Sequence, residues 1–194
     1  QHGAWNTWAS AYAGLINDFI LVRYNAPNAS QMYPLANNVD ATIAGAEAGV
    51  GYQFNEHLQA DLSAMYAWGE NTTDNKPLPQ IAPLEGRLNL RYVQEKYSLG
   101  LLWRAVAEQN RISLNDGNIV GYDMGKSKAF STLAMNATYK YSEALDFSVG
   151  IDNLLDKAYS EHLNKSGAAL FGYAANEQFN NIGRNYWARV SMKF

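Results

Sequence analysis

The chain has 194 residues, a formal net charge of −3 and no cysteine, which excludes disulfides, thiolate metal sites and cysteine nucleophiles. Charged residues make up 17% of it, against about 25% in an average soluble domain, while 13% are aromatic. No basic cluster predicts a nucleic-acid partner. No stretch approaches the roughly 20 apolar residues of a transmembrane helix. The first residues carry no signal peptide, so the protein is either cytoplasmic or its signal was removed or lies upstream.

Alternation with a period of two dominates the first half of the chain and predicts β-strands. Residues 3–15 and 19–24 predict a hairpin that turns at Asn17 and Asp18. Residues 44–54 and 58–68 place apolar or aromatic side chains at even positions, and the polar turn Asn55-Glu56-His57 joins them.

The second half continues the pattern. Residues 88–92 and 97–103 flank a turn at 94–96, residues 133–141 and 147–151 flank a turn at 142–144, and residues 186–194 form a last alternating run. The sequence therefore predicts nine strands in total.

The connections differ systematically in length. Short turns lie near Asn17, Asn55, Gln94 and Ser142, whereas the alternate connections, 25–38, 70–83, 110–126 and 153–183, are long. A soluble antiparallel sandwich also alternates, but it does not explain why the long loops gather at one end. The pattern is typical of an all-β, antiparallel transmembrane β-barrel in the bacterial outer membrane, with lipid as a partner, short periplasmic turns and long extracellular loops.

The strand count suggests that part of the barrel is missing. Bacterial single-chain barrels have even strand numbers, so nine strands would place one end of the chain outside the cell. We therefore expect residues 1–194 to be the C-terminal portion of a larger barrel.

Two C-terminal motifs resemble those of TonB-dependent outer-membrane receptors. The first motif consists of Asn153, Leu154, Leu155, Asp156, Lys157 and Tyr159, and the second is Gly183-Arg184, which leads into the last strand. Residues 159–164 and 17–21 are similar to the copper receptors within that family. The family's copper ligands would lie upstream, so none is assigned here.

This resemblance implies a barrel of about 22 strands. It further implies an upstream signal peptide and plug domain, energy from TonB through the missing N-terminal region, and uptake of a metal or metal chelate. Copper is the favoured ligand and a ferric siderophore is the alternative. A passive porin or an outer-membrane enzyme is the competing class.

The final alternating run also resembles the C-terminal signal read by the outer-membrane assembly machinery. Its apolar positions are Tyr186, Ala188, Val190, Met192 and Phe194. A terminal strand offers an open hydrogen-bonding edge until the barrel closes, so we expect this run to be an assembly signal as well as a lipid-facing surface.

The polar positions of the strands carry both signs of charge. The cations are Arg87, Arg91, Arg104, Lys140, Arg189 and Lys193, and the anions are Glu47, Asp61, Glu85, Glu108, Asp146 and Asp152. Because barrel interiors are polar, these residues predict a solvated or plug-facing wall with compensating charges and some ion pairs.

Metal and catalytic candidates are few. His162 with Met32 or Met124 could supply soft ligands for copper, and we treat these three as weak candidates. Ser160, Glu161 and His162 are the only local catalytic combination. Because neighbours on an extended segment point to opposite faces, they do not form a triad. Neither an enzyme nor a cofactor is expected.

Overall fold

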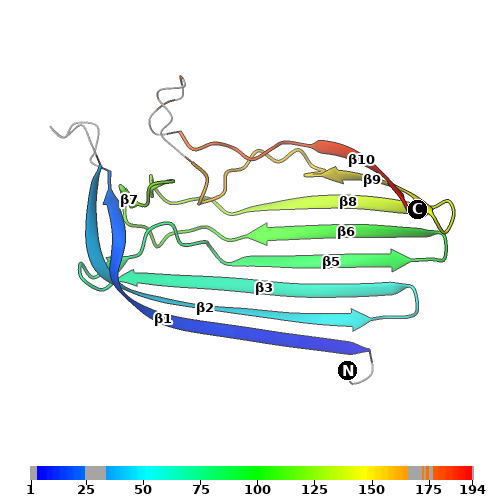
Figure 1. Ribbon diagram of the computed structural model, residues 1–194, viewed down its shortest axis with the longest axis horizontal. Coiled ribbons are helices and arrows are strands. Elements are labelled where there is room, and N and C mark those ends of the chain that lie inside the picture. Colours follow the sequence, from blue (N-terminus) through cyan, green and yellow to red (C-terminus); the bar gives the residue numbers. More distant parts are fainter. Residues whose placement is uncertain (1–3, 25–33, 166–171, 173, 175–176, 194) are drawn as a thin grey trace.

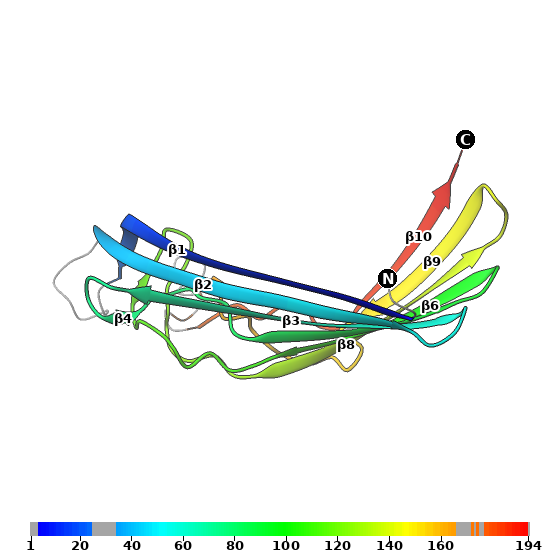
Figure 2. The same ribbon diagram turned by 90° about the horizontal axis from the view of Figure 1, so that it is seen from below.

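The computed structural model describes residues 4–24, 34–165, 172, 174 and 177–193, which form one antiparallel sheet. Ten strands follow the spatial order β10-β9-β8-β6-β5-β3-β2-β1-β7, with β4 paired to β3 (Figure 1). The sheet is curved, with β1 and β10 on the same side of β8 (Figure 2). In the part of the chain that the structure describes, no helix has the length and apolar character needed to cross a membrane.

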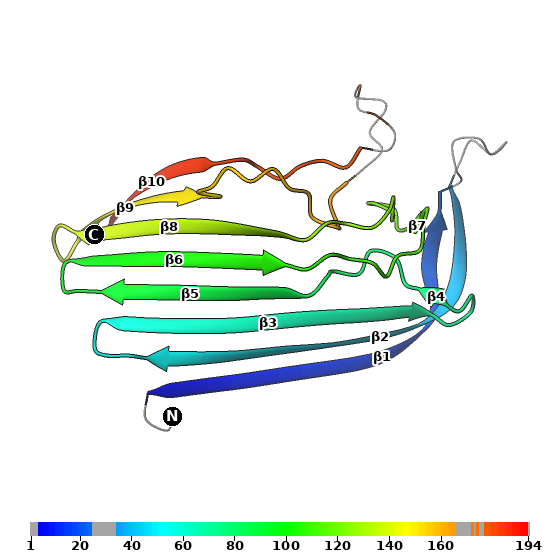
Figure 3. The same ribbon diagram turned by 180° about the vertical axis from the view of Figure 1, so that it is seen from behind.

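Eight of the ten strands are long. They are β1 (Trp5–Arg23), β2 (Leu35–Gln53), β3 (Leu58–Asn71), β5 (Glu85–Val93), β6 (Tyr97–Val106), β8 (Phe130–Lys140), β9 (Leu145–Asp152) and β10 (Asn185–Met192). The other two, β4 (Lys76–Pro77) and β7 (Asp116–Gly117), have two residues each and lie in the long connections. The segregation of short turns and long loops to opposite ends is confirmed (Figure 3).

The hairpin predicted at Asn17 and Asp18 is wrong, because β1 runs through both residues as one strand. Ile16 pairs with Ala41 and Phe19 with Val39, so two residues of β1 oppose one residue of β2. This is a β-bulge, and Asp18 adopts a left-handed φ of 57°. With β1 counted once, both described ends of the chain lie at the short-turn end (Figure 1). The odd strand count therefore no longer supports the expectation of missing strands.

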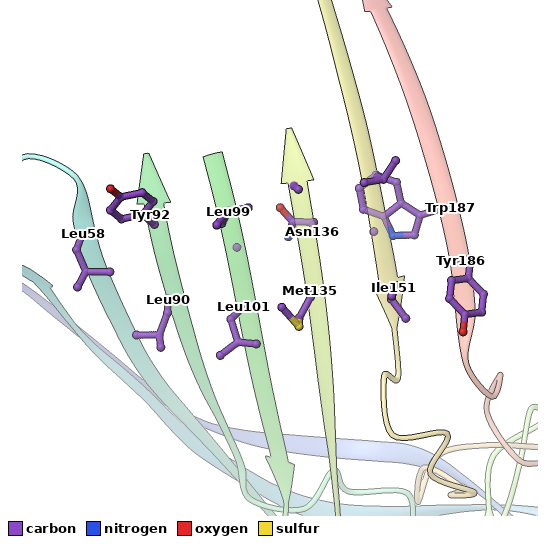
Figure 4. Close-up of a pocket in the computed structure, with 14 residues that line it drawn as sticks. Leu58, Leu90, Tyr92, Leu99, Leu101, Met135, Asn136, Ile151, Tyr186 and Trp187 are labelled. Carbon is purple, nitrogen blue, oxygen red and sulfur yellow. The ribbon is translucent and has the colours of Figure 1, made fainter. Parts of the chain in front are cut away.

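One face of the sheet is apolar across neighbouring strands. A single row runs through Leu90, Leu101, Met135, Ile151 and Tyr186 on β5, β6, β8, β9 and β10 (Figure 4). No second layer covers this row in the described chain, and Met135 stays 47% exposed and Tyr186 66% exposed. We call this side the apolar face and the opposite side the polar face.

The polar face also carries aromatic rings, which lie over glycines on the neighbouring strand. A Cβ added to Gly49 would lie 2.4 Å from the Trp8 ring, and one added to Gly150 would lie 2.3 Å from the Trp187 ring. These glycines are paired directly with the two tryptophans. Only a residue without a side chain leaves room for the ring, so the glycines are required for close packing on this face.

Candidate functional site

The buried polar side chains gather at the long-loop end of the sheet. They are Asn71, Glu85, Gln109, Ser113, Asp116, Asp123, Asn153 and His162. All of them lie within, or beside the ends of, the connections 72–84, 107–129 and 153–184. Because buried polar groups need partners, this cluster determines how the three connections are held together.

Asp123 is the centre of this cluster, with a side chain that is 0% exposed. Its Oδ1 accepts hydrogen bonds from the backbone N–H and the Nε2 of Gln80, both at 3.0 Å. Its Oδ2 accepts one from the backbone N–H of Ser113 at 2.9 Å. His162 Nε2 lies 3.2 Å from Oδ1, although its alignment is not that of a hydrogen bond. One carboxylate thus contacts all three long connections.

The surroundings of Asp123 favour its charged form. Burial by itself raises the pKa of this carboxyl, but His162 and the hydrogen bonds from Gln80 and Ser113 outweigh burial and lower the pKa below its ordinary value. A carboxyl with a depressed pKa stabilises the fold above its unfolded pKa of about 4. That stabilisation is lost as the pH falls through the lower, folded pKa.

We therefore expect the Asp123 contribution to be constant from about pH 7 to pH 5 and to shrink below about pH 4. The measurement is the free energy of unfolding of the full-length protein and of its Asp123→Ala variant, by urea titration at several pH values. The quantity to follow is the difference between the two. A difference that already shrinks between pH 7 and pH 5 would contradict this assignment.

A second group of contacts joins the end of β1 to the same connections. Arg23 forms an ion pair with Asp74, and its Nε lies 4.0 Å from Asp116 Oδ1. Asp116 Oδ2 accepts a hydrogen bond from Ser113 Oγ at 2.6 Å, and Asp74 Oδ2 accepts one from Asn71 Nδ2 at 2.8 Å. Arg23 thus connects the sheet to two loops.

A third group joins the wall to the last connection through Arg104. Its guanidinium donates to Glu85 Oε2 and to Glu161 Oε1, both at 2.6 Å. Arg87 Nε donates to Glu85 Oε1 at 2.5 Å. The side chains of Arg104 and Glu85 are 20% and 8% exposed, and Arg104 also lies over the Phe130 ring. The ion pairs expected on the polar wall are therefore present, and one of them extends to a loop.

The family described as "TonB dependent receptor-like, beta-barrel" has a profile that matches residues 1–154. The chain belongs to this family. TonB-dependent receptors are bacterial outer-membrane barrels and transporters, so the expected localisation and the absence of an enzymatic role are confirmed. In such barrels the short turns are periplasmic and the long loops extracellular.

Solved structures agree with this assignment. The structure titled "Copper transporter OprC" is 44% identical over 100% of this chain and 29% of that chain, with a TM-score of 0.94. The FrpB iron transporter of Neisseria meningitidis (F5-1 variant) is 17% identical over 100% of this chain and 30% of that chain, with a TM-score of 0.71. The siderophore receptor PirA of Acinetobacter baumannii is 18% identical over the same shares, with a TM-score of 0.70. These last two share the fold alone.

The chain thus spans about 30% of the length of each of these three structures. Among curated proteins, no match was found.

The metal candidates in this TonB-dependent receptor occupy different environments. His162 is 4% exposed beside Asp123, Met124 follows Asp123 in the chain and is half-buried, and Met32 lies outside the described residues. No group of three histidine, aspartate or glutamate side chains within the described ranges is placed to hold a metal ion. A metal-binding role for His162, Met32 and Met124 stays a prediction.

The residues that sequence reasoning considered for a catalytic triad have separate partners. Ser160 Oγ donates to Asn180 Oδ1 at 2.7 Å, whereas Glu161 pairs with Arg104 and His162 contacts Asp123. Sequence reasoning missed that Glu161 and His162 anchor this loop. Asp123 was also missed, because its partners are 10 to 43 residues away in the chain.

The family motifs connect the two ends of the last long loop. Asn153, with a left-handed φ of 48°, donates to the Lys157 carbonyl and accepts from the Lys157 N–H, both at 2.9 Å. Asp156 Oδ1 accepts from the Arg184 N–H at 2.8 Å, and Arg184 Nε donates to the Leu154 carbonyl at 2.9 Å.

The remaining motif residues differ in their surroundings. Tyr159 packs on Phe130 with ring centroids 4.3 Å apart, and Leu155 is 72% exposed. A Cβ added to Gly183 would lie 2.9 Å from Asp156 Oδ1, so glycine fits closely there. These contacts indicate that both motifs shape the base of the loop.

The proposed assembly strand lies at an edge of the described sheet. Tyr186, Ala188, Val190 and Met192 pair with Ile151, Val149, Phe147 and Leu145 and share the apolar face. Among the described residues, β10 has a strand partner on one side only. Phe194 lies outside the described residues. The assembly role stays a prediction.

A hollow in the described chain lies on the apolar face. It has a volume of about 590 Å³ and is lined mainly by side chains such as Leu90, Leu101 and Met135 (Figure 4). Met135 is the one soft ligand in this lining, and no histidine, aspartate or glutamate accompanies it to complete a metal site. In a membrane-spanning barrel this face meets lipid, so the hollow is not a candidate ligand site.

Proposed function

We propose that the full-length protein is an outer-membrane receptor that takes up copper. The supporting observation is the 44% identity and TM-score of 0.94 with the copper transporter OprC. Iron and siderophore receptors with the same fold are 14 to 18% identical to this chain. Because the chain spans 29% of OprC, the activity of the whole protein is part of the proposal.

We further propose that residues 1–194 are the C-terminal portion of the barrel. Two observations support this. The whole of this chain aligns with only 29% of a related receptor, and the described sheet is open between β1 and β10. An open sheet leaves unpaired backbone groups that a closed barrel pairs.

In this proposal, each part of the described chain has a distinct structural role in the receptor. The apolar face meets outer-membrane lipid, and the polar face lines the interior and contacts the receptor's own plug domain. The loop cluster around Asp123 keeps the extracellular connections in one arrangement. TonB acts through an N-terminal region, the assembly machinery inserts the barrel, and the copper ligands lie elsewhere in the receptor.

The test is copper uptake by cells under copper limitation. Cells that produce the full-length receptor should accumulate more copper than a deletion strain, because the deletion strain lacks receptor-mediated entry across the outer membrane. Mass spectrometry of washed cells measures the copper content. Uptake of a ferric siderophore by the same two strains serves as the control and should be equal. Equal copper content with unequal iron uptake would replace copper with the siderophore alternative.

A further inference from the structure

A second hollow, of about 320 Å³, lies between the connections 107–129 and 153–184 at the extracellular end. Lys126 and Lys128 line it from the first connection and Lys157 from the second. We call this hollow the lysine groove. Its volume is near the lower end of small-molecule sites, which are roughly 300–1,000 Å³.

The lysine groove concentrates positive charge in a chain with a net charge of −3. Three of the eight lysines of the sequence line it, and no aspartate or glutamate does. All three side chains are exposed, and within the described chain none of their ammonium groups has an ion pair or hydrogen bond. By contrast, Arg23, Arg104 and Arg111 are all paired with carboxylates. The cations of the groove are therefore available to an external anion.

The backbone around the groove is fixed by contacts on both sides. Ser127 exchanges two backbone hydrogen bonds with Gln109, at 3.1 and 3.2 Å, which holds the segment between Lys126 and Lys128. The Asn153 side chain holds the backbone of Lys157. The Phe130 and Tyr159 rings, 4.3 Å apart, line the groove together. Because the groove is already formed, a ligand would meet a small ordering cost.

We propose that the lysine groove binds an anion with phosphoryl groups. Ammonium groups are compact charges that suit phosphate oxygens, and three of them match an anion with several negative charges. Two sources share this chemistry: a free phosphate compound outside the cell, and the phosphorylated headgroup of an outer-leaflet lipid. The site is independent of the copper proposal, since a cluster of three ammonium groups repels a metal cation.

The test uses the full-length receptor in phosphatidylcholine nanodiscs, with two arms. In the first arm, inorganic pyrophosphate is titrated in by calorimetry. In the second, nanodiscs also contain lipid A, and its retention on the receptor is measured by native mass spectrometry. A triple variant, Lys126→Gln, Lys128→Gln and Lys157→Gln, should weaken binding at least about tenfold in the arm that reports the true source.

Matched variants separate the site from general charge. Changing all three groove lysines to arginine keeps the charge and should keep binding within about threefold. Lys76→Gln, Lys96→Gln and Lys140→Gln together remove the same charge away from the groove and should leave binding unchanged. The single variant Lys128→Gln, which should lose about threefold, serves if the triple variant does not assemble. Binding in neither arm, an unaffected triple glutamine variant, or an equal loss in the distant variant would overturn the proposal.

Discussion

Asp123→Ala is expected to loosen the extracellular connections together, at a cost of about 3 kcal/mol in local stability. The substitution removes the acceptor of three hydrogen bonds, two from Gln80 and one from Ser113, at a position where the side chain is 0% exposed. Each buried donor left without a partner costs about 1–3 kcal/mol, and water at the loop end recovers part of that sum.

Hydrogen exchange of the full-length receptor measures this effect. Peptides that cover residues 78–84 and 107–124 should exchange about 100-fold faster, since every 1.4 kcal/mol is about a factor of ten. Asp18→Asn is the matched control, because Asp18 is exposed and asparagine also tolerates its left-handed φ of 57°. Faster exchange in only one of the connections would contradict a shared anchor.

Arg104→Met is expected to destabilise the contact between the wall and the last loop by about 2–3 kcal/mol. It removes the cation that lies between Glu85 and Glu161. The side chain of Glu85 is only 8% exposed. Losing one partner of a fully buried ion pair costs about 3–5 kcal/mol. We expect less here, because the Glu161 side chain is 24% exposed and water can solvate it. Urea titration of the full-length receptor gives the size of the effect.

Two further variants test the cause. If uncompensated carboxylates are responsible, adding Glu85→Gln and Glu161→Gln to Arg104→Met should restore most of the lost stability. Arg87→Met removes the other cation of Glu85, but its side chain is 55% exposed, so it should cost less than about 1 kcal/mol. A cost for Arg87→Met equal to that of Arg104→Met would show that burial does not govern the network.

The sequence predicted the sheet well because alternation is a local signal. The strands around Asn55-Glu56-His57 and Gln94 follow the predicted parity, and the registers place their apolar positions in continuous rows. Asn17 and Asp18 were misread because hairpin turns and β-bulges both favour residues that tolerate a left-handed φ. Only the pairing of both halves of β1 with β2 distinguishes the two, and pairing is not visible in a local window.

The site was less predictable, because most of its contacts join residues that are far apart in the sequence. The alternation placed Glu85 and Arg104 on the polar wall, and their ion pair follows from adjacent strands. Asp123 and Glu161 lie in long connections without periodicity, and their partners are set by how separate loops fold over the sheet. The family motif includes both Asn153 and Lys157. The Asn153 side chain accepts a hydrogen bond from the Lys157 N–H only four residues further along the chain, so this contact is local.

The bulge in β1 has a consequence for the direction of every side chain beyond it. Before the bulge, even-numbered residues such as Trp8 lie on the polar face, whereas after it Phe19 shares the face of Val39, so odd-numbered residues take that side. Arg23 therefore faces Asp74 and Asp116 instead of the lipid side. One extra residue thus reverses the alternation of side chains between the two faces for the rest of β1. As a result, the long-loop end of this strand, where β1 and β2 bend in Figure 1, contacts the loops and supports them.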